Sequence, residues 1–394
     1  MAPRSSEALK TLFLTLVLAG CGQPATDPTP GSGGAGGTAP SRSDGGSGGG
    51  GAPIGGGGGA ASGGSSSTAG AGDASGGSPG AGGAAAGGSG ADADAGASGT
   101  GGGAGKPDGP PPASGPAKIV LVAGGGNGGD GTPAVMASTS KPFGAVVDPL
   151  NGDVYIAEYG GHKVRRIDDK GIISTVMGAG ATGPGGKITL GQPHNLLFQP
   201  NSHILFVADT MAGRVIRMDT TTGESTVFMS GLGTIYTVGF DPSGEHLYLN
   251  TGGISIVDLK TMMTTKVNTA SPRVFAVDSK KNVYLAGGPN LRVADAAGKI
   301  ADVMGSAGLS APKGLFADLD DNVVIADTES GTIRKYVIAT KTVVKIAGGG
   351  GGKGTLDGAP EMAGLARPHG VFVDGQGRIW IADSFNDRVL RIDH

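Results

Sequence analysis

A pair of short strand-like segments occurs six times in the second half of this 394-residue chain. In each pair, an apolar segment ending in Ala-Asp or a variant is followed by a loop and by a segment rich in Arg, Val and Ile. The pairs are Val154–Glu158 with Lys163–Asp168, Leu205–Asp209 with Arg214–Asp219, Leu247–Thr251 with Ile254–Asp258, Val283–Gly287 with Leu291–Asp295, Val323–Asp327 with Thr332–Tyr336, and Ile379–Asp383 with Arg388–Asp393. Because a β unit that recurs in this way cannot bury its own faces, the copies must stack against one another.

Further β-type segments flank each pair, and turn sequences such as Asn151-Gly152 connect them. The preceding segments are Gly144–Asp148, Asn195–Gln199, Val238–Asp241, Val274–Asp278, Gly314–Asp318 and Gly370–Asp374. The following segments, present in five copies, are Ile172–Met177, Ser225–Met229, Thr264–Asn268, Ile300–Met304 and Thr342–Ile346. Four antiparallel strands per repeat predict an all-β protein with the fold of a six-bladed β-propeller.

The last repeat ends at His394 without a fourth strand. Lys118–Ala123 has the matching pattern, since Lys-Ile-Val-Leu-Val-Ala-Gly-Gly-Gly is similar to the sequence that begins at Val343. We therefore expect Lys118–Ala123 to be the outer strand of the last blade and to close the ring.

The repeats resemble the NHL family over about 117–394, which implies an NHL-type propeller. The best copies combine Pro142-Phe143-Gly144 with Val154–Glu158, and Pro368-His369-Gly370 with Ile379–Asp383. The third and fourth copies depart most from the family pattern.

Acidic residues end the second strand of several repeats, at Asp209, Asp327 and Asp383. A metal site is one interpretation of these carboxylates. Because they recur around the ring, we expect them instead to accept hydrogen bonds from backbone N–H groups in the following loop.

The N-terminus is typical of an export signal. Arg4 and Lys10 make it basic, and the apolar run Thr11–Ala19 is shorter than the ~18–20 residues that span a bilayer. Leu18 to Cys21 resembles the lipobox of bacterial lipoproteins, which implies a signal peptide over 1–20 and a lipid on Cys21. An ordinary signal peptide or a short core helix is the alternative.

Residues 21–116 are nearly all Gly, Ala, Ser and Thr, with a Pro-rich end. Such a composition offers too little apolar surface to offset the entropy of ordering, so we expect a disordered linker. It would separate a folded domain over 117–394 from a membrane anchor.

The formal net charge is −3, which argues against a nucleic-acid partner.

Gly22 is not the Asp that retains some lipoproteins at the inner membrane, so we expect an exported cell-envelope lipoprotein on the outer membrane or cell surface. We expect a monomer, bound to the membrane through its lipid anchor.

The residue after each opening proline, or its equivalent, should lie at one mouth of the central channel. These residues are Phe143, His194, Tyr236, Arg273, Lys313 and His369. Alternate blades would place His194, Arg273 and His369 in a triangle. A water-lined channel, a pocket for a small anion such as a carboxylate or phosphate, and a metal site are the three interpretations of this set.

The Pro-His sequences that contain His194 and His369 resemble those of peptidyl-amidoglycolate lyases, whose propellers hold a central zinc ion through three His ligands. This resemblance implies zinc or another divalent metal on His194 and His369. Arg273 stands at the third position and cannot ligate zinc at ordinary pH.

The leading hypothesis is a membrane-anchored envelope module that binds a protein, a glycan or a small anionic ligand. The alternative is a propeller enzyme, a metal-dependent lyase that acts on a small substrate at the central channel. Streptogramin lyases have a similar propeller. The fold itself serves both classes of protein, so it does not choose between them.

Overall fold

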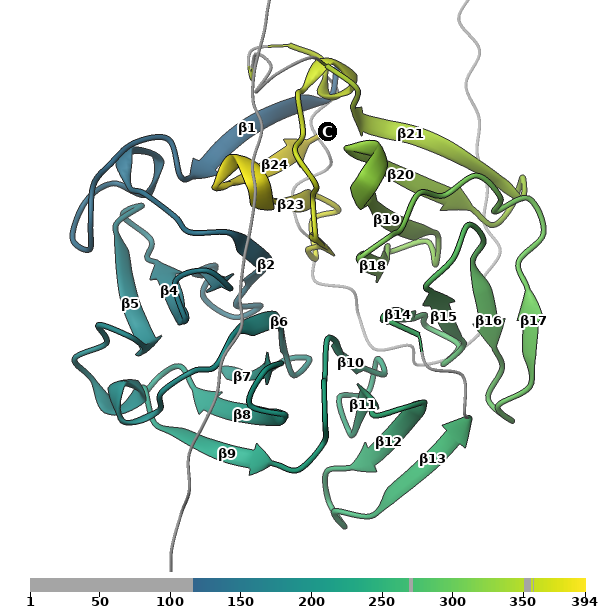
Figure 1. The fold of residues 1–394 in the computed structure, drawn as a ribbon, viewed down its shortest axis with the longest axis horizontal. Coiled ribbons are helices and arrows are strands. Elements are labelled where there is room, and N and C mark those ends of the chain that lie inside the picture. The colour runs from purple at the N-terminus through teal and green to yellow at the C-terminus, as the bar shows by residue number, and fades with distance from the viewer. Residues whose placement is uncertain (1–115, 269–271, 351–355, 357) are drawn as a thin grey trace, which may run out of the picture. The chain divides into compact units, whose positions relative to one another are not determined.

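The computed structural model describes residues 116–268, 272–350, 356 and 358–394. These residues form six four-stranded antiparallel sheets around a central axis (Figure 1). In five sheets the strands pair in chain order, and in the sixth the order is β1-β24-β23-β22. The prediction of an all-β, six-bladed propeller is therefore confirmed.

The blades are numbered from the sheet that begins with β2. Blade 1 contains β2 (Pro142–Val147), β3 (Val154–Glu158), β4 (Lys163–Ile167) and β5 (Ile173–Gly178). Blade 2 contains β6 (Pro193–Phe198), β7 (Ile204–Asp209), β8 (Arg214–Asp219) and β9 (Ser225–Met229). Blade 3 contains β10 (Val238–Phe240), β11 (His246–Asn250), β12 (Ile254–Asp258) and β13 (Thr264–Asn268).

Blade 4 contains β14 (Val274–Val277), β15 (Val283–Ala286), β16 (Arg292–Ala294) and β17 (Ile300–Asp302). Blade 5 contains β18 (Gly314–Ala317), β19 (Val323–Asp327), β20 (Thr332–Val337) and β21 (Thr342–Gly348). Blade 6 contains β22 (Gly370–Val373), β23 (Ile379–Asp383), β24 (Arg388–Asp393) and β1 (Lys118–Ala123). Blade 4 has the shortest outer strands, in the part of the ring where the repeat pattern is weakest.

The second strand lies in the interior of each blade, between the first and third strands, and in β3, β19 and β23 it is apolar up to its acidic last residue. All residues of β3, β19 and β23 are buried. A strand covered on both faces needs apolar side chains on both, so these strands are continuous apolar runs and not alternating patterns. The outer strand β9, in contrast, is only partly buried.

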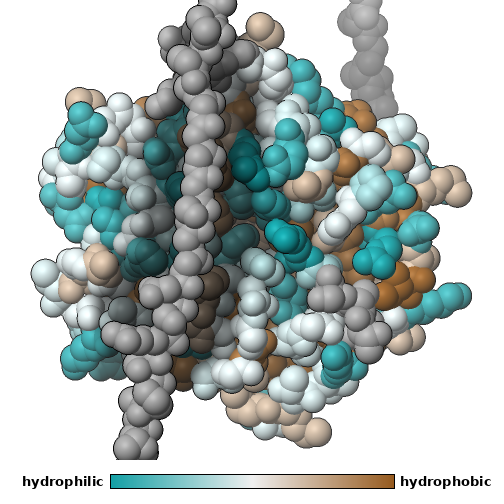
Figure 2. Space-filling model, viewed as in Figure 1, coloured by the Kyte–Doolittle hydropathy of each residue, from teal (hydrophilic) through white to brown (hydrophobic). Residues whose placement is uncertain are grey.

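The described loops contain five short 3-10 helices. They are η1 (Ala134–Met136), η2 (Pro184–Lys187), η3 (Thr328–Ser330), η4 (Pro360–Met362) and η5 (Ser384–Asn386). Figure 2 shows the face seen in Figure 1, where hydrophilic residues gather around the centre of the ring. Among the described residues, no helix is long and apolar enough to cross a bilayer.

The predicted signal peptide (1–20), Cys21 and nearly all of the predicted linker (21–116) lie outside the described residues. The lipid anchor and the linker therefore stay predictions.

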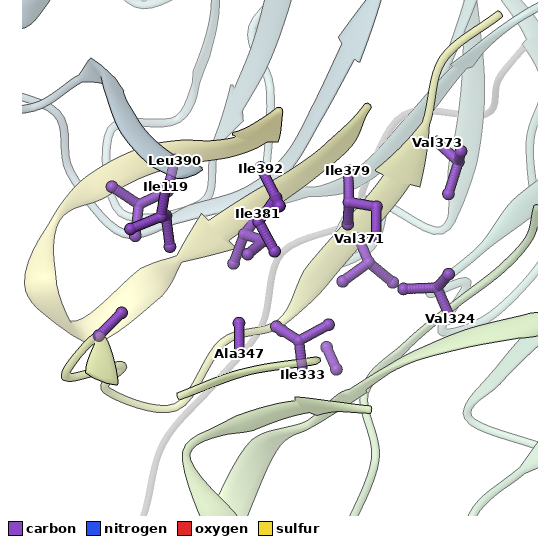
Figure 3. Close-up of a cluster of buried hydrophobic side chains, with 12 residues drawn as sticks. Ile119, Val324, Ile333, Ala347, Val371, Val373, Ile379, Ile381, Leu390 and Ile392 are labelled. Carbon is purple, nitrogen blue, oxygen red and sulfur yellow. The ribbon is translucent and has the colours of Figure 1, made fainter. Parts of the chain in front are cut away.

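The ring closes through β1 and β24, as the sequence predicts. Ile119 is paired with Ile392, and Leu121 with Leu390. Ile119 is 1% exposed and belongs to a core cluster that joins blades 5 and 6 (Figure 3). The cluster also includes Val324 of blade 5, so the closing strand contributes to packing between blades as well as within one.

Replacing Ile119 with alanine should lower the free energy of unfolding by about 2–4 kcal/mol, because the change leaves a cavity in this cluster. Urea denaturation of the full chain would measure the loss. Val344→Ala is the matched control, since Val344 is 41% exposed on the outer strand β21. Equal losses in the two variants would contradict a stabilising role for the closing strand.

Candidate functional site

The candidate residues of blades 1 and 2 lie at bulges in the innermost strands. In blade 1 the pairing passes from Pro142 with Glu158 directly to Gly144 with Ala157, so Phe143 has no partner in the register. His194 has the same position in blade 2. A bulge redirects a side chain out of the normal alternation, which is how these two side chains come to face the channel.

In three other blades a backbone hydrogen bond fixes the candidate residue just before the innermost strand. The backbone N–H of each candidate residue donates to the carbonyl of the alanine that is paired with the next residue along the chain. These bonds join Arg273 to Ala286 at 3.2 Å, Lys313 to Ala326 at 3.1 Å, and His369 to Ala382 at 3.1 Å. The candidate position is therefore defined by the backbone of the blade and not by one residue type.

A strand-end carboxylate holds the loop that leads into this position. Asp209 Oδ1 accepts hydrogen bonds from the N–H groups of Gly191 at 2.8 Å and Gln192 at 3.0 Å, just before His194. Its other oxygen pairs with Arg214 Nε at 2.9 Å. The Asp is fully buried, so one side chain ties this loop to the first residue of β8.

Equivalent contacts recur in other blades. The N–H of Ser310 donates to Asp327 at 2.5 Å, and that of Ala366 donates to Asp383 at 2.7 Å. In blade 3, Asn250 Oδ1 accepts from the N–H groups of Tyr236 and Thr237, both at 3.0 Å.

The expectation that Asp209, Asp327 and Asp383 accept backbone N–H groups is therefore confirmed, but the expected loop is wrong. The following loop donates side chains instead, Ser330 Oγ to Asp327 and Asn386 Nδ2 to Asp383. The amides come from the loop that precedes the innermost strand. These amides come within reach because, in an antiparallel pair, the end of the second strand lies beside the start of the first.

The candidate residues converge on a small hollow of about 20 Å³ at the channel mouth. Five of the six predicted residues line it: Phe143, His194, Tyr236, Lys313 and His369. Arg273 is exposed beside the hollow, with its guanidinium carbon 5.7 Å from the centre of the Tyr236 ring. The predicted triangle is thus uneven, because the ring centres of His194 and His369 lie 6.1 Å apart while Arg273 does not line the hollow.

Stacked rings fill the mouth. Phe143 lies between Tyr159 and His369, with ring centres 4.2 Å and 4.0 Å away. His194 meets the edge of Phe143 at 5.0 Å and Tyr236 at 5.3 Å. This packing leaves the mouth with room for about one oxygen-sized group, since a single water needs ~10–15 Å³.

Both histidines are neutral at ordinary pH. Burial, together with electrostatic repulsion from His369 and Lys313, lowers the pKa of His194 to about 3. Burial also lowers the pKa of His369 to about 4. His369 Nδ1 lies 2.8 Å from the carbonyl of Arg367, so Nδ1 donates and Nε2 remains an acceptor.

Cationic side chains surround this neutral centre. Burial lowers the pKa of Lys313, and Glu329 pairs with Lys313 at 3.8 Å and with Arg367. The exposed ring of Phe385 lies 4.9 Å from the Arg367 guanidinium carbon and 5.5 Å from Lys141 Nζ. The mouth therefore combines aromatic faces with several positive groups.

Sequence reasoning missed Tyr159, Phe385 and Arg367. Tyr159 and Phe385 follow the second strands of their blades, and Arg367 precedes Pro368. The repeat pattern does indicate Tyr159 and Phe385, because the end of a second strand lies beside the start of the first. Residues just after the strand-end carboxylate should therefore have been included among the mouth candidates.

The donor set at the mouth does not fit a three-ligand metal site. Within the described ranges, no group of three or more His, Cys, Asp or Glu residues is placed to hold a metal ion. His194 and His369 supply two nitrogen donors, and the nearby charged groups include Lys313 and Arg273. Zinc on these histidines remains a prediction from the resemblance.

Comparison with known proteins supports the fold. No family model matches the chain. The Arabidopsis thaliana protein SUPPRESSOR OF QUENCHING 1, chloroplastic, is 26% identical over 272 residues, which are 65% of this chain and 25% of that protein. The chain thus spans about a quarter of the length of this relative.

Two solved structures from Bacteroides thetaiotaomicron are similar in fold. A protein of unknown function matches with a TM-score of 0.59 and 18% identity, covering 70% of this chain and 76% of its own. An auxiliary nutrient binding protein matches with a TM-score of 0.57 and 16% identity, with the same coverage of each chain. At such low identity the similarity shows a shared propeller fold.

Acidification should destabilise the protein through His194 and His369. Their pKa values are lower in the folded state than the ordinary value near 6.5, so the unfolded chain takes up more protons as the pH falls. Between pH 6.5 and pH 5, each should remove about 1.5 kcal/mol of stability. Urea denaturation at several pH values would measure this slope.

The double variant His194→Gln with His369→Gln should flatten the slope, whatever its stability at pH 7. His162→Gln, at an exposed loop position, is the control and should leave the slope unchanged. An unaltered slope in the double variant would show that these imidazoles are not the neutral groups described above.

Purified protein incubated with zinc and then dialysed should retain well below one zinc per chain, because catalytic and structural zinc sites use at least three protein ligands. Elemental analysis would measure the content. One equivalent of zinc that disappears in both His194→Ala and His369→Ala would instead support the metal interpretation.

Proposed function

We propose that this chain is a binding module of the cell envelope, which recognises an anionic group at the mouth of an NHL-type propeller. The observation that carries this proposal is the convergence of His194, His369 and Lys313 on one small hollow. Arg273 and Arg367 add positive charge beside it.

The size of the hollow limits what enters it. About 20 Å³ admits one oxygen of a carboxylate or phosphate, so the rest of the ligand would lie on the surface of the mouth. The half-buried Tyr236 and the exposed Phe385 offer aromatic faces for it. A glycan, an extracellular protein or a small molecule that carries such a group would satisfy this geometry.

Anion binding should be linked to proton uptake. An anion beside a neutral imidazole favours the imidazolium form and raises its pKa. His194 and His369 would therefore gain protons more readily in the complex, and the affinity would increase as the pH falls toward 5.5. Positive charge on Lys313 contributes at every pH in this range.

A solved structure with a similar fold supports a binding role for this propeller. A Bacteroides thetaiotaomicron propeller of similar architecture is described as an auxiliary nutrient binding protein. Export through the predicted signal peptide, attachment to the outer membrane or cell surface through Cys21 and display on the Gly-rich linker are further parts of the proposal. They rest on the N-terminal sequence. A metal-dependent lyase would need a third zinc ligand where Arg273 stands.

Inorganic phosphate at about ten times its Kd should raise the melting temperature of the full chain by about 3–5 °C, because it binds the folded state. Lys313→Met and Arg273→Met should each weaken binding about fivefold to tenfold, because a charged partner of the anion is lost. Differential scanning fluorimetry and calorimetry at low salt would measure both effects.

Lys266→Met removes an exposed lysine on the outer strand β13 and serves as the control. Equal weakening in this variant would mean that phosphate responds to overall charge and not to the mouth. If neither phosphate nor acetate binds at any pH between 5.5 and 7.5, the anion-binding proposal is wrong.

A further inference from the structure

A second and larger cavity lies along the axis of the propeller. Its volume is about 410 Å³, and residues from all six innermost strands line it. The mouth residues stand at the starts of these strands, whereas this cavity extends to their ends at Pro149, Asp278 and Leu319. It therefore faces the opposite side of the ring, in the size range typical of small-molecule sites, ~300–1,000 Å³.

Apolar side chains make up most of the wall. They include Phe198, Phe240, Phe275, Phe316, Phe372 and Leu197. Neighbouring blades brace some of these rings, since Phe316 and Phe372 meet edge to face with centres 4.9 Å apart. Gly239 also lies close against the Phe275 ring, where an added Cβ would come within 2.6 Å. Rings held in this way keep the cavity open.

The ionisable residues that line the cavity are all acidic. Among the described residues they are Asp241, Asp278, Asp318 and Asp321. Three of them pair with lysines: Asp241 with Lys281 at 2.9 Å, Asp318 with Lys335 at 3.0 Å, and Asp321 with Lys280 at 3.4 Å. No lysine, arginine or histidine in the described part of the chain lines the wall.

Asp278 differs from the other three. It is 2% exposed, and the hydrogen bonds found for it in the described structure come from uncharged groups. Oδ1 accepts from the N–H groups of Lys280 at 2.9 Å and Asn282 at 2.8 Å, and Oδ2 accepts from Asn282 Nδ2 at 2.8 Å. Among the described residues no lysine or arginine pairs with this carboxylate, which borders the apolar wall of the cavity.

We propose that this cavity binds an amphipathic amine, with an apolar or aromatic body among the phenylalanines and a protonated amino group directed toward Asp278. A carboxylate beside an apolar, weakly screening wall attracts a cation and repels an anion. Asp278 lies at the opposite ends of the innermost strands from the mouth, and the two hollows share lining residues such as Thr237 and Leu315 midway along the channel.

Three probes with similar bodies and different end groups test the proposal: 2-phenylethylamine, 2-phenylethanol and 3-phenylpropionate. Calorimetric titration of the full chain at pH 7.5 should give an affinity for the amine about tenfold or more above that for the alcohol, because a charged hydrogen bond is added. The carboxylate should bind most weakly. Equal affinity for all three, or no binding of the amine, would overturn the proposal.

Asp278→Asn should lower the affinity for the amine about tenfold and leave that for the alcohol unchanged. Asp295→Asn is the matched control. Asp295 Oδ1 accepts from the N–H groups of Ala297 at 3.0 Å and Lys299 at 2.9 Å in the same way as Asp278, and Asp295 does not line the cavity. A similar loss of amine affinity in both variants would contradict the role of Asp278.

Ala317→Leu supplies an independent test, because Ala317 lines the cavity and the larger side chain would occupy part of it. Binding of both the amine and the alcohol should weaken. Unchanged binding in this variant would show that the probes bind elsewhere.

Discussion

A buried strand-end side chain that accepts backbone N–H groups from a neighbouring loop is the contact on which the channel mouth depends. Asp209 and Asp383 make it with amides two to three residues before His194 and His369, and Asn250 makes it in blade 3. Ordered loops are needed at a binding site, and buried carboxylates need partners. One contact meets both needs. It allows the residue at the mouth to vary from His to Tyr to Lys while its backbone stays in place.

The fold could be predicted from the sequence because it follows from a pattern repeated along the chain. The apolar second strands, the turn residues and the missing strand after Arg388–Asp393 were enough to predict the sheets and the closure by Lys118–Ala123. The candidate site was predictable only in part. The position after each opening proline identified five residues of the mouth, but not how they pack. Whether Phe143 stacks on His369 and leaves about 20 Å³ depends on side-chain contacts between blades, which one repeat does not encode.

The two ends of the channel have different chemistry because they are built from different parts of the repeat. The mouth is formed where innermost strands begin, and its bulged residues include His194, Lys313 and His369. The opposite end is formed where these strands stop at aspartates that accept the amides of tight turns, as Asp278 and Asp318 do. The turn requirement thus makes one end acidic. The strand starts carry no such requirement, so their side chains are free to serve recognition.

The pairing of β1 with β24 also determines when the ring can form. Ile119 cannot form its strand pair until Ile392, far along the chain, is present. Contacts between residues so distant in sequence slow folding, because a long loop has to close before they form. Five blades can assemble their four strands from neighbouring segments, but blade 6 stays incomplete until β24 is available. A chain that emerges from its N-terminus, from a ribosome or across a membrane, therefore carries β1 without its partner until β24 has appeared.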